Sequence, residues 1–266
     1  MKSEKSEFTR RVLGIVLGVP PFIILLLFNQ WTLMGAFIVL SYLSFQEYWK
    51  MVGKEPSSFA FWFSCYPLAL VYLSFVLSPF LQMLGWYIFL LMLMIWSLFS
   101  PSQVLERSGI YLWGCVYCFF FPFFWVRLGM EYSRWSLLFF VLLVWANDIF
   151  AYLVGVKWGR HKIVPAISPK KSWEGLGGGI MAAAFLSMMV GYLWFRFPLW
   201  VGFLAGCAVA LLAFAGDLFE SALKRKAGVK DSGKFLPGHG GILDRFDSFF
   251  AVGPLVYFLS RVIWKG

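Results

Sequence analysis

The residues best equipped for chemistry gather between Ser221 and Asp247. This stretch reads SALKRKAGVKDSGKFLPGHGGILDRFD, and it holds six of the 23 Lys and Arg residues, three of the 13 acidic residues and one of the two His residues of the chain. The segments before and after it are apolar and long enough to be membrane helices. A dense polar stretch between two such helices indicates a functional loop at a membrane surface.

Acidic side chains stand at helical spacing on both borders of this stretch. Four polar residues before and within it are three or four positions apart: Asp217, Glu220, Ser221 and Lys224. They share one helical face if the helix continues past the membrane surface. The helix dipole disfavours acids at a C-terminal end, so a bound cation would resolve that conflict. Asp244 and Asp247 are three apart at the expected start of the next helix, on the same side of the membrane, so the two acidic faces can meet.

Two further polar groups precede this region. Asp148, next to Asn147, lies roughly 10 Å inside an expected span, where a charge is costly and usually faces a cavity or a partner. A hydrogen bond between helices is the alternative for this pair. The loop 159–179 carries Lys170 and Lys171 before a glycine-rich helix start, where free backbone N–H groups favour a phosphate. The alternative there is a basic cytoplasmic loop followed by a glycine-rich packing face.

Oxygen ligands without cysteine suit a hard cation such as Mg²⁺, which binds a few carboxylates together with substrate phosphates. Lys and Arg residues around the carboxylates would neutralise further phosphate charge. The combination predicts a phosphoryl- or nucleotidyl-transfer site at a cytoplasmic membrane surface. A solvated loop between helices is the competing interpretation.

The composition predicts an all-α, polytopic helical membrane protein. The chain has 266 residues, of which 61% are hydrophobic and 14% charged, with a mean hydropathy of +0.76. Soluble domains are about half apolar and about a quarter charged. The net charge of +10 is explained by basic cytoplasmic loops, so nucleic acid is not an expected partner. Cys115 and Cys118 have metal-site spacing without a second pair, and we interpret them as small buried hydrophobic residues.

Nine spans are expected, at about 12–28, 31–45, 59–77, 84–99, 110–126, 136–156, 176–197, 199–216 and 248–264. With the N-terminus in the cytoplasm, 18 of the 23 basic residues fall on the inner side and five on the outer side. This bias follows the positive-inside rule and places the polar stretch in the cytoplasm. We treat residues 1–266 as one integral membrane domain, with scaffold helices over about 1–140 and catalytic helices and loops over about 141–266.

The polar stretch resembles the signature of the phosphatidate cytidylyltransferase (CDP-diacylglycerol synthase) family. The matching residues are Ser221, Leu223, Lys224-Arg225, Lys230-Asp231, Gly233, Leu236-Pro237, His239-Gly240-Gly241 and Asp244-Arg245-Phe246-Asp247. The segments 168–175 and 216–221 are also similar to that family. The resemblance is strong over about 145–250 and covers only hydropathy and helix count over the first 140 residues.

The resemblance implies an enzyme of phospholipid biosynthesis. Phosphatidate and CTP would give CDP-diacylglycerol and pyrophosphate with Mg²⁺, in a homodimer of nine-helix subunits in the inner (cytoplasmic) membrane, with the active site facing the cytoplasm. The family's metal aspartates correspond to Asp217 and Asp244, and a second cation beside Mg²⁺ is allowed for. The candidate catalytic residues are Asp148, Asp217, Lys224, Asp244 and Asp247. The candidate substrate-binding residues are Lys170, Lys171, Ser172, Glu220, Ser221, Arg225, Lys230, Asp231, Lys234, His239 and Arg245.

Two other functions compete with cytidylyl transfer as an interpretation of the sequence. The motif of CDP-alcohol phosphotransferases, two Asp before Gly-x-x-Ala-Arg and two further Asp, is not found in the sequence. A cation transporter using Asp148 and Asp217 is the other rival. Transporters place their sites near the membrane midplane between repeats, whereas the charges here cluster at cytoplasmic helix ends and no repeat is visible. His239 fits either a phosphate contact or a structural role.

Overall fold

The computed structural model describes residues 23–52, 58–98, 104–233 and 240–264, and within these ranges the fold is helical. The elements are α2 (Gln30–Val52), α3 (Ser58–Leu73), α4 (Pro79–Leu98), α5 (Val104–Cys115), the π-helical segment η2 (Val116–Phe120), α6 (Phe121–Glu131), α7 (Arg134–Trp158), α8 (Trp173–Phe195), α9 (Leu199–Lys226) and α10 (Leu243–Ile263). The described residues contain one isolated β-bridge, between Lys162 and Ser172. The all-α prediction is therefore confirmed for this part of the chain.

Five helices are long and apolar enough to cross a membrane: Ser108–Glu131, Arg134–Trp158, Trp173–Phe195, Leu199–Lys226 and Leu243–Ile263. They cover the last five expected spans. α2, α3 and α4 coincide with three more expected spans but do not meet the same criterion over their described residues. Most of the first expected span lies outside the described residues. The helices fit a membrane protein, and the count of nine stays a prediction.

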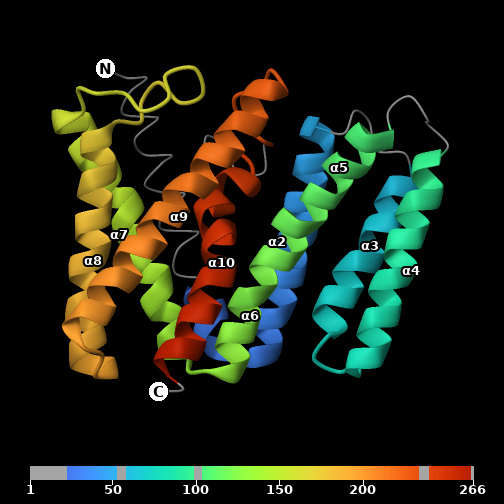
Figure 1. Cartoon of the computed structure of the whole chain (residues 1–266), viewed down its shortest axis with the longest axis horizontal. Helices are drawn as coiled ribbons and strands as arrows, with labels where there is room; N and C mark the ends of the chain where they lie inside the picture. Colours follow the sequence, from blue (N-terminus) through green and yellow to red (C-terminus); the bar gives the residue numbers. More distant parts are fainter. Residues whose placement is uncertain (1–22, 53–57, 99–103, 234–239, 265–266) are drawn as a thin grey trace.

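The C-terminal helices form a closely packed group. α8 packs against both α7 and α9, and α10 packs against both α9 and α6 (Figure 1). Small residues allow these close approaches: a Cβ added to Gly206 on α9 would lie 2.5 Å from the Cα of Ala184 on α8. Helix pairs in membranes rely on such small residues because lipid gives no hydrophobic drive for association.

The N-terminal helices cover the other side of α10. α2 packs against α6, and the hairpin of α3 and α4 lies at the edge of the bundle farthest from α8 (Figure 1). Trp125 on α6 stacks on Phe249 of α10 with ring centroids 3.8 Å apart and donates its indole N–H to the Phe249 carbonyl at 2.8 Å. Cys115 and Cys118 are buried and free, as their interpretation as small hydrophobic residues requires.

The π-helical segment joins α5 to α6 and changes the direction of the side chains around it. Segments of this kind are rare and often occur near functional sites. Here Tyr117 is buried, and its hydroxyl donates to the backbone carbonyl of Asp247 at 3.1 Å. The segment thus ties the middle of the α5–α6 span to the first turns of α10.

The polar elements gather at one end of the bundle. The loop between α7 and α8, the C-terminal end of α9 and the N-terminal end of α10 all lie at the top of Figure 1. The prediction that these segments share one side is therefore confirmed, and they enclose the cavity described next.

Candidate active site

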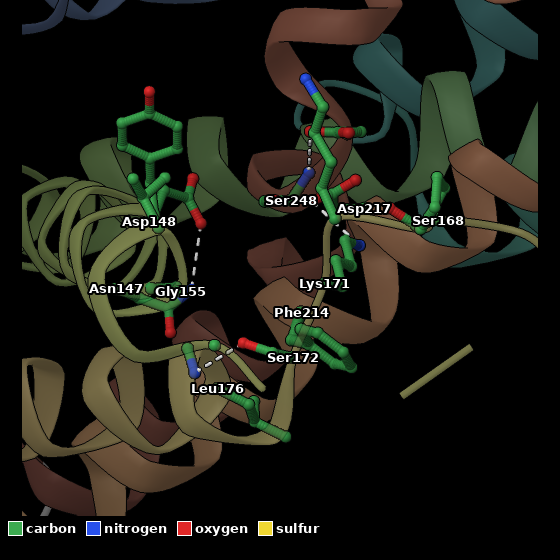
Figure 2. Close-up of a pocket in the computed structure, with 18 of the residues that line it drawn as sticks. Asn147, Asp148, Gly155, Ser168, Lys171, Ser172, Leu176, Phe214, Asp217 and Ser248 are labelled. Carbon is green, nitrogen blue, oxygen red and sulfur yellow. Dashed lines mark hydrogen bonds and ion pairs between the residues drawn. The ribbon is translucent and has the colours of Figure 1, made fainter. Parts of the chain in front are cut away.

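A cavity of about 880 Å³ opens between α7, α9, α10 and the α7–α8 loop. Five aspartates line it: Asp148, Asp217, Asp231, Asp244 and Asp247. Five cationic residues also line it: Lys162, Lys170, Lys171, Lys224 and Arg245. Figure 2 shows Asp217 and Lys171 together on one side of this cavity and Asp148 on the other side. The tertiary structure thus brings together polar groups that are about a hundred residues apart in sequence.

The exposed end of α9 carries one polar face, as the spacing predicts. α9 continues to Lys226, and Ser221 Oγ donates to Asp217 Oδ1 one turn away at 3.3 Å. Lys224 Nζ lies 2.5 Å from Glu220 Oε2, and the Glu220 side chain is 0% exposed. Glu220 and Ser221 do not line the cavity; they brace the residues that do.

Asp244, in the first turn of α10, is held by four donors. Its Oδ1 pairs with Lys224 Nζ at 2.7 Å. Its Oδ2 accepts the Ser232 and Gly241 backbone N–H groups, each at 2.8 Å, and the Ser232 hydroxyl at 3.0 Å. The acidic side chain at the helix N-terminus also has a favourable dipole interaction. This network fixes the direction of the carboxylate before any substrate arrives.

The acids at the end of α9 are neutralised by lysines of the protein. Lys171 Nζ lies 3.0 Å from Asp217 Oδ2 and 4.8 Å from the ring centroid of Phe214. Lys224 neutralises Glu220 and Asp244 from between them. The conflict with the helix dipole, which suggested a bound cation, is thus relieved by ammonium groups in the structure. Both lysines are placed to meet phosphate oxygens that enter the same cavity.

The loop that delivers Lys170 and Lys171 is fixed at both ends. Ser172 caps α8 by accepting the Gly175 N–H at 3.2 Å, and its side chain packs against the α7 glycines. Glu174 accepts the backbone N–H groups of Arg160 and His161. In the middle, Arg225 of α9 donates to the Ile167 carbonyl at 3.1 Å. Ser172 thus has a capping role, and its contact with substrate stays a prediction.

Asp148 and Asp247 enter the cavity from different helices, α7 and α10. Asp148 is exposed to the cavity and accepts the Asn147 amide at 3.0 Å; both residues lie on α7, so this contact is not the hydrogen bond between helices that was the alternative. Asp247 accepts the Ser248 N–H at 2.6 Å and lines the same cavity one turn below Asp244. Asp148 on α7, Asp217 on α9 and Asp247 on α10 thus line one cavity.

The other predicted residues divide into three groups. Lys170, Asp231 and Arg245 line the cavity. Arg225 and Lys230 do not line it; Arg225 tethers the α7–α8 loop, and Lys230 is exposed. Lys234 and His239 lie outside the described residues, so their roles stay predictions.

Lys162 on the cavity wall was not among the predicted site residues, and neither were Glu47 and Ser232 beside the cavity. Glu47, on α2, accepts the backbone N–H groups of Ile242 and Leu243 at 3.0 and 2.9 Å. Ser232 joins the Glu47 and Asp244 carboxylates through its hydroxyl, 3.0 Å from each. The available signal for Glu47 was an acid beside an apolar span, but nothing local to residue 47 indicates a partner near residue 242. The N-terminal helices therefore contact the polar site as well as supporting it.

The donor set fits a divalent cation that shares its coordination with a substrate. Within the described ranges, no three Asp, Glu, His or Cys side chains converge into a complete metal cage. Asp217 has one lysine and one hydroxyl as partners, both flexible side chains. Asp244 Oδ2 already accepts three donors, so its Oδ1, beside Lys224, is the oxygen open to a metal. Two carboxylates plus phosphate oxygens is the pattern that Mg²⁺ prefers.

Comparisons with known proteins agree with a site for nucleotidyl transfer. The sequence matches the model of the Cytidylyltransferase family over residues 9–263. It is 31% identical over 281 residues to a phosphatidate cytidylyltransferase of Synechocystis, covering 94% of this chain and 95% of that protein. It is 37% identical over 175 residues to that of Thermotoga maritima, covering 62% of this chain and 63% of that protein, which is less than two thirds of its length. It is 30% identical over 256 residues to the uncharacterized protein YnbB of Escherichia coli, covering 87% and 80%.

Proposed function

Because the chain belongs to the cytidylyltransferase family, we propose that it transfers the cytidylyl group of CTP to phosphatidate and forms CDP-diacylglycerol and pyrophosphate. Family membership makes it a nucleotidyltransferase. The observation that carries the choice of reaction is the cavity: five aspartates and five cationic side chains line one space at the end of a group of membrane helices. A site that binds a lipid phosphate and a nucleoside triphosphate together needs such a mixture of cations and metal-binding acids.

The reaction is an in-line displacement at phosphorus. An oxygen of the phosphatidate phosphate forms a bond to the α-phosphorus of CTP, and the bond from that phosphorus to the bridging oxygen breaks, releasing pyrophosphate. The nucleophile is already an anion near neutral pH, so no strong general base is needed. The protein must bring two polyanions together, and it does so by positioning and charge neutralisation.

The lysines of the cavity supply that neutralisation. Lys171 and Lys224 are held over the cavity by Asp217 and Asp244, so their ammonium groups are ordered before substrates bind. Lys170 and Arg245 line the same cavity and extend the positive surface. Ordered cations stabilise the extra charge of the transition state without a reorganisation cost at the moment of reaction.

Asp217 and Asp244 would hold Mg²⁺, with Asp148 and Asp247 on the same cavity to orient its shell and with room for a second cation. When bound, the ion neutralises phosphate charge and stabilises the leaving pyrophosphate. The carboxylates contribute by facing the substrates from fixed helix ends. Asp244 is fixed most firmly, by the four donors that surround it.

The cellular setting is part of the proposal. The basic residues of the sequence favour nine crossings with the N-terminus and this cavity on the cytoplasmic side of the inner membrane, where CTP is present. A homodimer is proposed from the family resemblance. Phosphatidate would come from the bilayer and CTP from the cytoplasm.

The test is direct. Purified protein is given phosphatidate, labelled CTP and Mg²⁺, and the lipid-soluble cytidine product is measured. Wild-type protein and the distant charge variant Glu106→Gln should form the product, because Glu106 is exposed at the start of α5 and does not line the cavity. In Asp217→Asn, the rate of product formation should fall at least about 100-fold, the cost typical of removing one key electrostatic group. Folded wild-type protein that forms no product, but conducts ions in empty liposomes, would favour the transporter instead.

A further inference from the structure

We propose that Glu47 is a positioning residue of the active site, which acts from the N-terminal part of the chain through Asp244. This inference rests on the proposed function, because Asp244 belongs to the machinery assigned above. Glu47 lies on α2 and does not line the cavity. Among the described residues, its hydrogen bonds go to Ser232, Ile242 and Leu243, which surround Asp244.

Glu47 caps α10 from another helix. Its Oε1 accepts the Ile242 N–H at 3.0 Å and its Oε2 accepts the Leu243 N–H at 2.9 Å. The N-cap position of α10 is Ile242, which has no polar side chain and provides no cap of its own. The first N–H groups of a helix have no partner inside the helix, and the dipole there attracts an anion. Glu47 therefore supplies the acceptors and the negative charge that the local sequence lacks.

A serine links this cap to Asp244. Ser232 Oγ lies 3.0 Å from Glu47 Oε2 and 3.0 Å from Asp244 Oδ2. A hydroxyl has one proton, so it donates to one carboxylate at a time and keeps both close to the same atom. The Ser232 and Gly241 backbone N–H groups donate to Asp244 alone. Glu47 and Asp244 thus both bind Ser232 next to the start of α10.

Gly233 and Gly241 lie so close to the Glu47 carboxylate that a side chain at either position would contact it. A Cβ on Gly233 would lie 2.5 Å from Glu47 Oε1, and one on Gly241 would collide with the same carboxylate. Both positions therefore need a residue without a side chain for the backbone to reach Glu47. The backbone at Gly233 and Gly241 therefore lies close to an acid that is about 190 residues earlier in the sequence.

Replacement of Glu47 by Gln tests the proposal. An amide has one acceptor oxygen, so either Ile242 N–H or Leu243 N–H must face an NH₂ group. We expect kcat to fall about tenfold or more, with KM for CTP changed less than about threefold, since the lysines that meet phosphate are untouched. Glu106→Gln, the matched change of an exposed acid, should keep both constants.

Hydrogen exchange separates positioning from general stability. In Glu47→Gln, the amides of Ser232 and Gly241 should exchange at least about tenfold faster, although neither donates to Glu47, while amides in the middle of α8 keep their rates. Ser232→Ala, which removes the link and leaves the cap, should lower kcat less. In the double variant Glu47→Gln with Ser232→Ala, the fold decrease in kcat should be smaller than the product of the two single decreases, because the groups belong to one network.

Two results would overturn the inference. One is an unchanged kcat and unchanged exchange at Ser232 and Gly241 in Glu47→Gln. The other is faster exchange throughout the protein with activity lost only in proportion to the folded fraction. If Glu47→Gln does not fold, Ser232→Ala decides by the same two measurements. Wild-type protein without product would refute the proposed reaction, whereas the exchange pattern would still test the link from Glu47 to Asp244.

Discussion

Lys224 pairs with two acids whose side chains are largely shielded from solvent, so its removal has a calculable cost. Its ammonium lies 2.5 Å from Glu220 and 2.7 Å from Asp244, whose side chains are 0% and 8% exposed. In Lys224→Met, Asp244 keeps three other donors, but Glu220 keeps no cation among the residues that the structure describes. Breaking a buried pair from one side typically costs 3–5 kcal/mol, and we expect about 3 kcal/mol of the unfolding free energy to be lost.

A second variant tests whether the loss of stability comes from the unpaired Glu220 side chain. Lys224→Met combined with Glu220→Gln replaces a lone buried charge by a neutral amide, so about 2 kcal/mol should return. Activity should not return, because the cation that meets the phosphate remains absent. The single change Lys230→Met, on an exposed lysine of the same region, should shift stability by less than about 0.5 kcal/mol.

The assay is titration of detergent-solubilised protein with a denaturing detergent, followed by the fluorescence of the 14 tryptophans. Product formation is measured on the same samples. The reasoning fails if Lys224→Met costs less than about 1 kcal/mol, or if Glu220→Gln adds to the loss instead of reducing it. Either result would mean that the Glu220 charge is compensated by something other than Lys224.

Three further outcomes are expected. Gly206→Ala should destabilise the protein by about 1–3 kcal/mol because its Cβ meets the α8 backbone, whereas Gly177→Ala, with nothing within 4 Å, should be neutral or slightly stabilising in the same titration. Lys171→Ala should raise the KM for CTP or phosphatidate about tenfold, since one phosphate-facing cation is lost; an unchanged KM for both would contradict that role. Removal of divalent cations with a chelator should abolish product formation, and added Mg²⁺ should restore it; persistent turnover would exclude the proposed metal site.

The helices could be predicted because a bilayer leaves little choice. A spanning segment must satisfy its backbone internally, so long apolar blocks become helices at recognisable places. The exact ends were harder. Hydropathy alone ends one span near 216 and starts the next near 248, whereas α9 continues to Lys226 and α10 begins at Leu243, as the helical spacing of the acids predicts. Hydropathy marks the membrane thickness, whereas capping and ion pairs decide where a helix ends.

The polar face of α9, the acids at the start of α10 and the basic loop before α8 were predictable from the sequence, because they depend on spacing within one helix or loop. Three contacts were not predictable: Lys171 neutralises Asp217, Lys224 joins Glu220 to Asp244, and Glu47 caps α10. Each of these contacts joins groups whose distance depends on how several helices pack. Packing is set by small residues and aromatic stacking across many helices, and no local pattern contains that information.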